Sequence, residues 1–213
     1  MNLQALFRRD GYAMVRELYT ADAMAQWKAA IAESLGPDVH VYVWTVDTIP
    51  DLFRGAFSAP AIVGAAKSIL GPNIEFLSAK PVIKSGATRT ASPWHQDYPY
   101  WGGSNKISAW IALEPATPAN GCLRVVKGGH QRPLEHQVSV GEEFGNRLDP
   151  ENLPEGEIVD CVMEPGDALF FSDLLPHSSY ENPEGIPRWS MIPTYRNADE
   201  PDSSTLWNSS MKL

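Results

Sequence analysis

The sequence predicts an α+β protein in which amino-terminal helices cover a β-sandwich or a β-barrel. Apolar residues with helical spacing are confined mainly to about the first 70 residues. The apolar runs that follow are short and rich in β-branched and aromatic side chains. The 18 prolines and 16 glycines are spread along the chain and mark turns between these runs. Helices first and strands after are typical of the α+β class.

Two helices are predicted in the first part of the chain. The first begins after Thr20, whose hydroxyl suits an N-cap, and ends at Gly36. The second has Pro60 in its first turn and ends at Gly71. Each carries one apolar stripe, made of Met24, Trp27, Ile31 and Leu35 in the first and of Ile62, Val63, Ala66, Ile69 and Leu70 in the second.

The strands are expected after residue 73, and the length of 213 residues favours one domain. We therefore expect residues 1–72 to form a mainly helical cover and residues 73–200 to form the β core. The polar, turn-rich stretch 130–154 is expected to be a long loop, and such loops are often active-site lids. The predicted strands are 74–84, 107–113, 123–126, 158–162, 168–171 and 189–195.

The composition excludes several classes of protein. The net charge of −9, from 17 basic and 26 acidic residues, disfavours nucleic acid as a partner. No apolar run is long enough for a membrane span. Arg8, Arg9 and Asp10 interrupt the place where an export signal needs its apolar region, so we expect a cytoplasmic protein. Cys122 and Cys161 form no metal-binding motif and are expected to be buried thiols in a reducing compartment.

Three residues are candidate metal ligands. His95 and Asp97 lie two positions apart, and such residues share a face if the segment is extended. Alone, this pair would more often be a surface pair or a hydrogen-bonded core pair. His177, directly after the run 168–171, adds a second imidazole. Two histidines and one carboxylate form the facial triad typical of non-haem Fe(II) sites with open coordination positions.

Arg188 and Ser190 are candidates for binding a carboxylate. They also lie two positions apart in a predicted strand and would share a face. A guanidinium binds a carboxylate as a fork, and the hydroxyl can add a third hydrogen bond. The alternative for Arg188 is a solvated residue at a strand end.

The motifs, taken together, resemble those of the phytanoyl-CoA dioxygenase-like family of Fe(II)- and 2-oxoglutarate-dependent oxygenases. The similarity covers most of the chain, from about residue 5 to residue 196. One departure is Lys127-Gly-Gly-His130, where the family usually has Pro-Gly-Ser-His. The segments that carry the resemblance are 7–12, 95–97, 108–113, 120–123, 127–130, 177 and 188–190.

The resemblance implies a double-stranded β-helix, which is a cupin-like jelly roll, with the amino-terminal helices packed on one sheet. It implies that Fe(II) is bound by His95, Asp97 and His177, and that 2-oxoglutarate and O₂ are cosubstrates. By the same resemblance, Arg188 and Ser190 hold the distal carboxylate of 2-oxoglutarate. Further residues implied near the cosubstrate are Trp110, Gln96 and either Lys80 or Lys84.

The reaction implied is oxidation of a C–H bond with release of succinate and CO₂. Hydroxylation is favoured over halogenation because the carboxylate ligand Asp97 is present, whereas desaturation, ring closure and epimerisation stay open. Tyr98, Tyr100 and Trp101 could line the mouth of the site or pack in the core. His130 could bind substrate or pack a loop. No role is assigned to His40 and His136.

The expected substrate is a free small molecule rather than a CoA thioester, because the chain has no dense basic cluster for the phosphates of CoA. We expect a monomer or a weak homodimer. Two other classes stay open: a metal-binding jelly roll of another kind, such as a hydrolase or isomerase, and a non-catalytic binding module. The Arg188–Ser190 pair argues against the former, and the complete triad argues against the latter.

Overall fold

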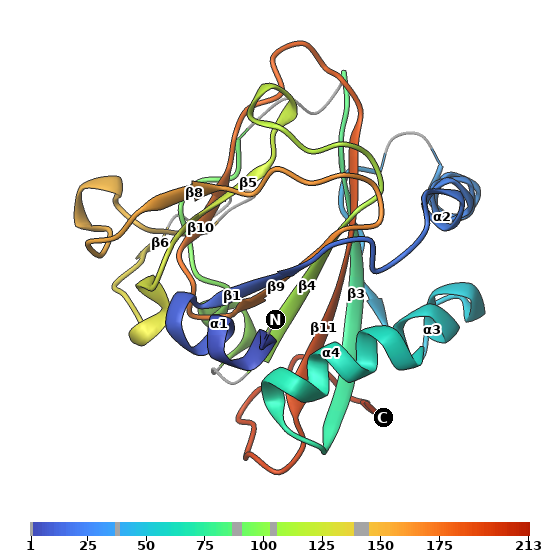
Figure 1. Cartoon of the computed structure of the whole chain (residues 1–213), viewed down its shortest axis with the longest axis horizontal. Coiled ribbons are helices and arrows are strands. Elements are labelled where there is room, and N and C mark those ends of the chain that lie inside the picture. The colour runs from blue at the N-terminus through green and yellow to red at the C-terminus, as the bar shows by residue number, and fades with distance from the viewer. Residues whose placement is uncertain (1, 37–38, 87–90, 103–105, 139–144) are drawn as a thin grey trace.

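A large antiparallel sheet forms one wall of the molecule (Figure 1). The structure, a computed structural model, describes residues 2–36, 39–86, 91–102, 106–138 and 145–213. In spatial order the strands of this sheet are β1 (Tyr12–Val15), β9 (Ala168–Ser172), β4 (Lys106–Ala112), β11 (Arg188–Asn197), β3 (Ile74–Lys84) and β12 (Met211–Lys212), and β2 (Trp44–Thr45) also pairs with β3.

A smaller sheet lies opposite the large one and completes the β core (Figure 1). Its strands, in spatial order, are β10 (His177–Ser179), β5 (Leu123–Val126) and β8 (Ile158–Asp160). A separate pair, β6 (Gln137–Val138) and β7 (Asn146–Arg147), lies within the stretch predicted as a lid. The two facing antiparallel sheets and the likeness to solved jelly-roll structures reported below confirm the predicted double-stranded β-helix.

The large sheet separates two apolar cores, as the alternation of strand side chains requires. Its outer face packs against the helices through residues such as Ile107, Ala109 and Phe170. Its inner face meets the small sheet through residues such as Trp110 and Phe171. The inner side therefore provides the space for a site between the sheets.

The helices cover the outer face of the large sheet (Figure 1). Both predicted helices are confirmed, and the hydroxyl of Thr20 accepts a hydrogen bond from the Ala23 amide as an N-cap. Trp27 packs edge-on against Phe53 and Phe57, with ring centroids 5.7 and 5.4 Å apart. No helix in the described ranges is long and apolar enough to cross a membrane. The helices of this cover are α1 (Leu3–Asp10), α2 (Ala21–Leu35), α3 (Asp51–Phe57) and α4 (Pro60–Leu70).

Some elements differ from the prediction. β1 and β2 lie inside the segment 1–72 predicted as a helical cover, and β12 lies beyond the predicted core 73–200. All three strands have at most 4 residues and are too short to show a period of two in the sequence. The long loop 130–154 contains β6 and β7, and its residues 139–144 lie outside the described residues.

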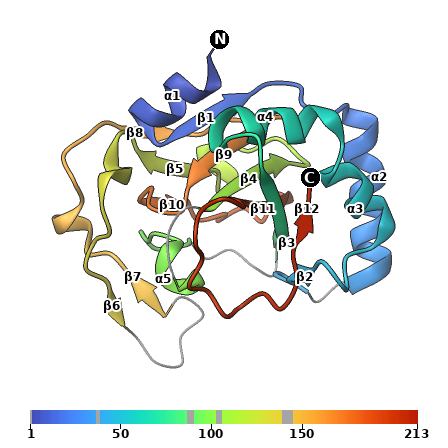
Figure 2. The same cartoon turned by 90° about the horizontal axis from the view of Figure 1, so that it is seen from below.

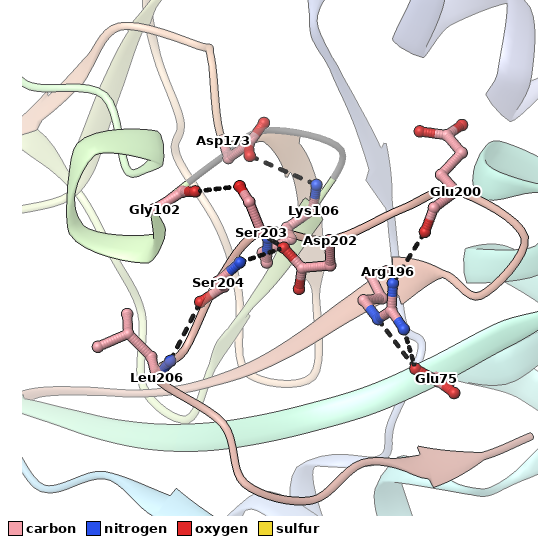
Figure 3. A network of polar contacts seen from close by, with 10 residues as sticks. All are labelled: Glu75, Gly102, Lys106, Asp173, Arg196, Glu200, Asp202, Ser203, Ser204 and Leu206. Atoms are coloured by element: carbon pink, nitrogen blue, oxygen red, sulfur yellow. Dashed lines mark hydrogen bonds and ion pairs between the residues drawn. The ribbon is translucent and has the colours of Figure 1, made fainter.

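The carboxyl-terminal segment 198–210 crosses the molecule between β11 and β12 and passes α5 (Tyr98–Trp101) (Figure 2). Figure 3 shows the polar contacts that hold it. The Lys106 ammonium group, whose side chain is fully buried, forms an ion pair with Asp202 at 2.7 Å. The Ser203 hydroxyl donates to the Gly102 carbonyl at 2.7 Å, next to the end of α5. The segment thereby supports the carboxyl-terminal end of α5.

Asp173 lies beside this network and predicts a pH dependence of stability (Figure 3). Burial, together with the nearby Asp97 carboxylate, raises the pKa of its carboxyl from 3.8 to about 7. Because the folded-state pKa exceeds the unfolded-state pKa, the folded state binds the proton more tightly. The stability that this proton contributes is full below about pH 4 and is lost as pH rises through about 7.

Asp173→Asn should therefore remove this loss in the metal-free protein. We expect the melting temperature of the variant to exceed that of the wild type by an amount that grows from about pH 4 to about pH 7. Thermal unfolding across this range in a chelator checks it. A difference that stays constant with pH would contradict the assigned pKa.

Candidate metal centre and carboxylate pocket

His95 and His177 lie directly opposite each other in an antiparallel bridge. Each backbone amide donates to the carbonyl of the other residue at 3.0 Å. Residues opposite each other in such a bridge point to the same face. Their imidazole rings accordingly meet between the sheets, with centroids 4.1 Å apart.

Asp97 completes a cluster of three potential ligands, although its segment is not a regular strand. Its backbone has φ −75° and ψ −25°, and α5 begins at the next residue. Its Oδ1 lies 3.8 Å from His95 Nε2 and 3.9 Å from His177 Nε2. These distances are too long for hydrogen bonds. One ion with bonds of about 2.1 Å reaches two atoms up to about 4.2 Å apart, so a single metal fits.

Both histidines present the nitrogen that a metal needs. Nδ1 of His95 donates to the Pro93 carbonyl at 2.8 Å, and Nδ1 of His177 donates to the Leu175 carbonyl at 2.9 Å. This leaves the Nε2 lone pairs directed at Asp97, as in metal sites whose imidazoles are oriented by backbone carbonyls. Burial lowers the pKa of His95 to about 3 and lowers that of His177. Both rings are therefore neutral at neutral pH.

Asp97 stays ionised in this buried place. Burial would raise the pKa of its carboxyl, but interactions led by the positive charge of Lys80 outweigh burial and lower the pKa. A carboxylate and two neutral imidazoles are the donor set of a non-haem Fe(II) facial triad. The residues present therefore fit the Fe(II) that the family resemblance implies.

Arg188 is a buried cation in the same cavity. Only 2% of its surface is exposed, and its guanidinium lies over the Trp110 ring at 5.2 Å. Nη1 donates to the Ser190 hydroxyl at 3.3 Å, whereas Nε has no hydrogen-bond partner among the described residues. Burial lowers the pKa of Arg188 to about 10. A buried guanidinium with an unused donor is suited to a carboxylate ligand.

The triad and the guanidinium open into one cavity of about 120 Å³. A dicarboxylate with one end at the triad and the other at Arg188 fits this arrangement. Ser190 lies beside Arg188 and also donates to the Val82 carbonyl at 3.2 Å. The lining residues are Val41, Lys80, Val82, Ser92, His95, Asp97, Trp110, Leu123, Phe171, His177, Ser179, Arg188 and Ile192.

The two candidate lysines occupy different places. Lys80 lines the cavity close enough to Asp97 to lower the pKa of its carboxyl. Lys84, in contrast, donates to the Ser179 hydroxyl at 2.9 Å and to the Tyr180 carbonyl at 2.7 Å. Lys84 thus links the large sheet to β10, and Lys80 is the better placed of the two for a contact with the cosubstrate.

Gln96 points away from the cavity, so the geometry argues against its predicted contact with the cosubstrate. Its neighbours His95 and Asp97 face inward, and its own amide holds the loop behind them. The amide nitrogen donates to the carbonyls of Arg132 at 3.0 Å and Leu174 at 2.5 Å. Its oxygen accepts from the Leu134 amide at 2.8 Å. Gln96 therefore positions the loop.

His136, for which the sequence indicates no role, accepts a hydrogen bond from the Gln96 backbone amide at 3.1 Å. It lies 40 residues away in sequence, and no spacing or motif indicates the contact. His136 and the Gln96 side chain together attach the start of the long loop to the segment that carries two of the three ligands.

The three aromatic residues after Asp97 pack rather than line the cavity. The Tyr100 hydroxyl donates to the Asn146 carbonyl at 3.0 Å, Tyr98 lies near the His136 ring, and Trp101 packs edge-on against Trp207. His130 likewise packs, since a side chain at Gly11 would come within 2.6 Å of its ring. Gly11, at φ +83°, allows this close approach.

Part of this chain is similar in sequence to curated proteins of known activity. Methylphosphonate hydroxylase of Gimesia maris is 41% identical over 112 residues, which are 51% of this chain and 40% of that protein. Peroxisomal phytanoyl-CoA dioxygenase of Rattus norvegicus is 34% identical over 142 residues, which are 62% of this chain and 42% of that protein. The chain thus spans about two fifths of the length of these relatives.

A solved structure shares the fold, and a family pattern matches most of the chain. The epimerase SnoN, in complex with Fe³⁺, α-ketoglutarate and nogalamycin RO, has a TM-score of 0.75 at 22% identity and covers 92% of this chain and 82% of its own. The sequence pattern of the family described as phytanoyl-CoA dioxygenase (PhyH) matches residues 7–188. The chain belongs to the phytanoyl-CoA dioxygenase family.

Proposed function

We propose that this protein is an Fe(II)- and 2-oxoglutarate-dependent dioxygenase that hydroxylates a C–H bond of a small molecule. One observation carries the proposal. A buried cluster of two neutral imidazoles and one carboxylate shares a cavity with Arg188, a buried guanidinium whose Nε has no partner among the described residues. The first group suits Fe(II), and the second suits the far carboxylate of 2-oxoglutarate.

The residues have distinct roles in this proposal. His95, Asp97 and His177 would hold Fe(II), which supplies the chemistry that oxidises a C–H bond with O₂ and 2-oxoglutarate and releases succinate and CO₂. Arg188, with Ser190, would fix the distal carboxylate, and Trp110 would orient the guanidinium from its ring face. The apolar walls Phe171, Leu123 and Ile192 would exclude water from the reacting atoms.

The other two classes are less well supported. A metal-dependent hydrolase or isomerase does not need a second site that binds a carboxylate inside the metal cavity. A non-catalytic module has no reason to retain three ligands with their orienting carbonyls. By its name, methylphosphonate hydroxylase acts on a small molecule, which supports a small-molecule substrate here.

The finer predictions belong to the same proposal. We propose a free metabolite rather than a CoA thioester as substrate, because the cavity is small and the described residues that line it include just two lysine or arginine side chains, Lys80 and Arg188. The monomeric or weakly dimeric state and the cytoplasmic location stay predictions. The two buried free cysteines, Cys122 and Cys161, are consistent with a reducing compartment.

Succinate formation tests the proposal. The purified protein is incubated with Fe(II), ascorbate, O₂ and 2-oxoglutarate, with and without a panel of small substrates, and succinate is quantified. We expect slow succinate formation without substrate and faster formation with the correct one. The absence of metal-dependent succinate formation under every condition would refute the proposal. The variant His177→Ala is the control for background oxidation by free iron.

A further inference from the structure

A cation–aromatic stack lies on the outer face of the small sheet, behind the metal ligands. The guanidinium of Arg124, on β5, lies 5.0 Å from the Trp94 ring centroid and 4.6 Å from the Tyr180 ring centroid. Its Nε donates to the Ser178 hydroxyl at 2.7 Å. Both ring contacts are within the range of cation–π attraction.

The stack joins the two segments that carry the histidines. Trp94 directly precedes His95, and Ser178 directly follows His177. In the register of β10 and β5, His177 pairs with Val125 and Ser178 pairs with Arg124. Alternation along these strands places His177 on the inner face and both Ser178 and Arg124 on the outer face. Arg124 thus contacts neither the cavity nor the ligands themselves.

Hydrogen bonds also join the two segments near the ligands, such as those from the Gln96 side chain to the Leu174 carbonyl at 2.5 Å and from the Tyr98 amide to the Asp173 carbonyl at 3.1 Å. His95 pairs with His177 through an isolated bridge, not through a continuous strand. Beyond its two backbone hydrogen bonds, the Ser179 amide donates to the Ser92 carbonyl at 3.2 Å, and the Ser92 amide donates to the Ser179 hydroxyl at 2.9 Å. Because the bridge is not part of a continuous pair of strands, side-chain contacts contribute to fixing the twist between the two segments. A planar cation clamped between Trp94 and Tyr180 restricts that twist.

We propose that Arg124 is a positioning residue for the metal centre. From the outer face of the small sheet, its side chain holds the His95 segment and the His177 segment at a fixed distance from each other. The inference rests on the proposed function, since it presumes that the triad binds a divalent ion. Metal affinity depends on ligands being held in place, and loss of a supporting contact typically weakens it about 10–100-fold. Arg124 contacts the neighbours of the ligands and not the ligands themselves, so its loss should weaken metal binding by a factor near the lower end of this range.

Arg124→Met in the full chain tests this inference, because methionine keeps an unbranched apolar stem without the planar cation or the Nε donor. Lys127→Met is the matched control. Lys127 follows the same strand, and its ion pair with Glu157, at 3.4 Å, touches neither histidine segment. Mn²⁺ serves as the probe, since divalent ions overlap in their affinity for such sites. The dissociation constant of Mn²⁺ and the metal-free melting temperature are measured for each protein.

We expect Mn²⁺ to bind Arg124→Met about 10-fold more weakly than the wild type and to bind Lys127→Met with unchanged affinity. A lower metal-free melting temperature with unchanged Mn²⁺ affinity would show a purely structural role and overturn the inference. If Arg124→Met fails to fold, Arg124→Lys, which keeps the charge but loses the planar stack, must show weaker Mn²⁺ binding. If the wild type itself binds no Mn²⁺ through the triad, the proposed function fails first.

Discussion

Asp97→Ala is expected to abolish succinate formation while the metal-free protein still folds. The carboxylate supplies one of three ligands, so its removal should lower turnover by more than about 100-fold, the upper end of the cost of losing a supporting contact. Folding should survive, because Asp97 has φ −75° and ψ −25°, which alanine adopts readily.

The measurement compares turnover with the metal-free melting temperature. Asp199→Ala is the control, since this carboxylate accepts hydrogen bonds from Asn73 on the exposed surface and lies outside the cavity lining. We expect the control to keep its turnover. Lost folding of Asp97→Ala would indicate a structural residue instead, and full turnover would remove Asp97 from the site and with it the triad.

The short-range parts of the site could be predicted from the sequence. The pairs His95–Asp97 and Arg188–Ser190 lie two positions apart, and extended or near-extended backbone brings such residues to one side. Asp97 lies in the cluster, as predicted, although its backbone is helical and not extended as the prediction assumed. The helix after Thr20 and the helix that begins at Pro60 could be predicted from their end signals and apolar spacing, because both signals are local.

The long-range parts could not be predicted, because nothing in local spacing encodes them. The contact of Gln96 with the loop at Leu134, and the hydrogen bond that His136 accepts, depend on the path of a loop with no periodicity. The sequence indicated that Gln96 lies between two ligands, but not that it faces the other way. The ion pair between Lys106 and Asp202 likewise joins residues 96 positions apart.

Arg188→Lys is expected to weaken 2-oxoglutarate binding well beyond the usual effect of a charge-conserving change. Lysine keeps the charge but loses the fork that binds both carboxylate oxygens. A lost hydrogen bond to a charged group costs about 1.5–3 kcal/mol. The dissociation constant should therefore rise about 10–150-fold. Titration of the metal-loaded protein with 2-oxoglutarate, without O₂, measures it.

Arg188→Met separates the carboxylate role from a structural one. Arg188 is 2% exposed, and burial lowers the pKa of its guanidinium to about 10. Burial of this charge therefore lowers the free energy of unfolding. Methionine fills similar space without charge. We therefore expect 2-oxoglutarate binding to be lost while the metal-free melting temperature is unchanged or higher. A fall in melting temperature with unchanged 2-oxoglutarate affinity would show that Arg188 stabilises the core and does not bind the cosubstrate.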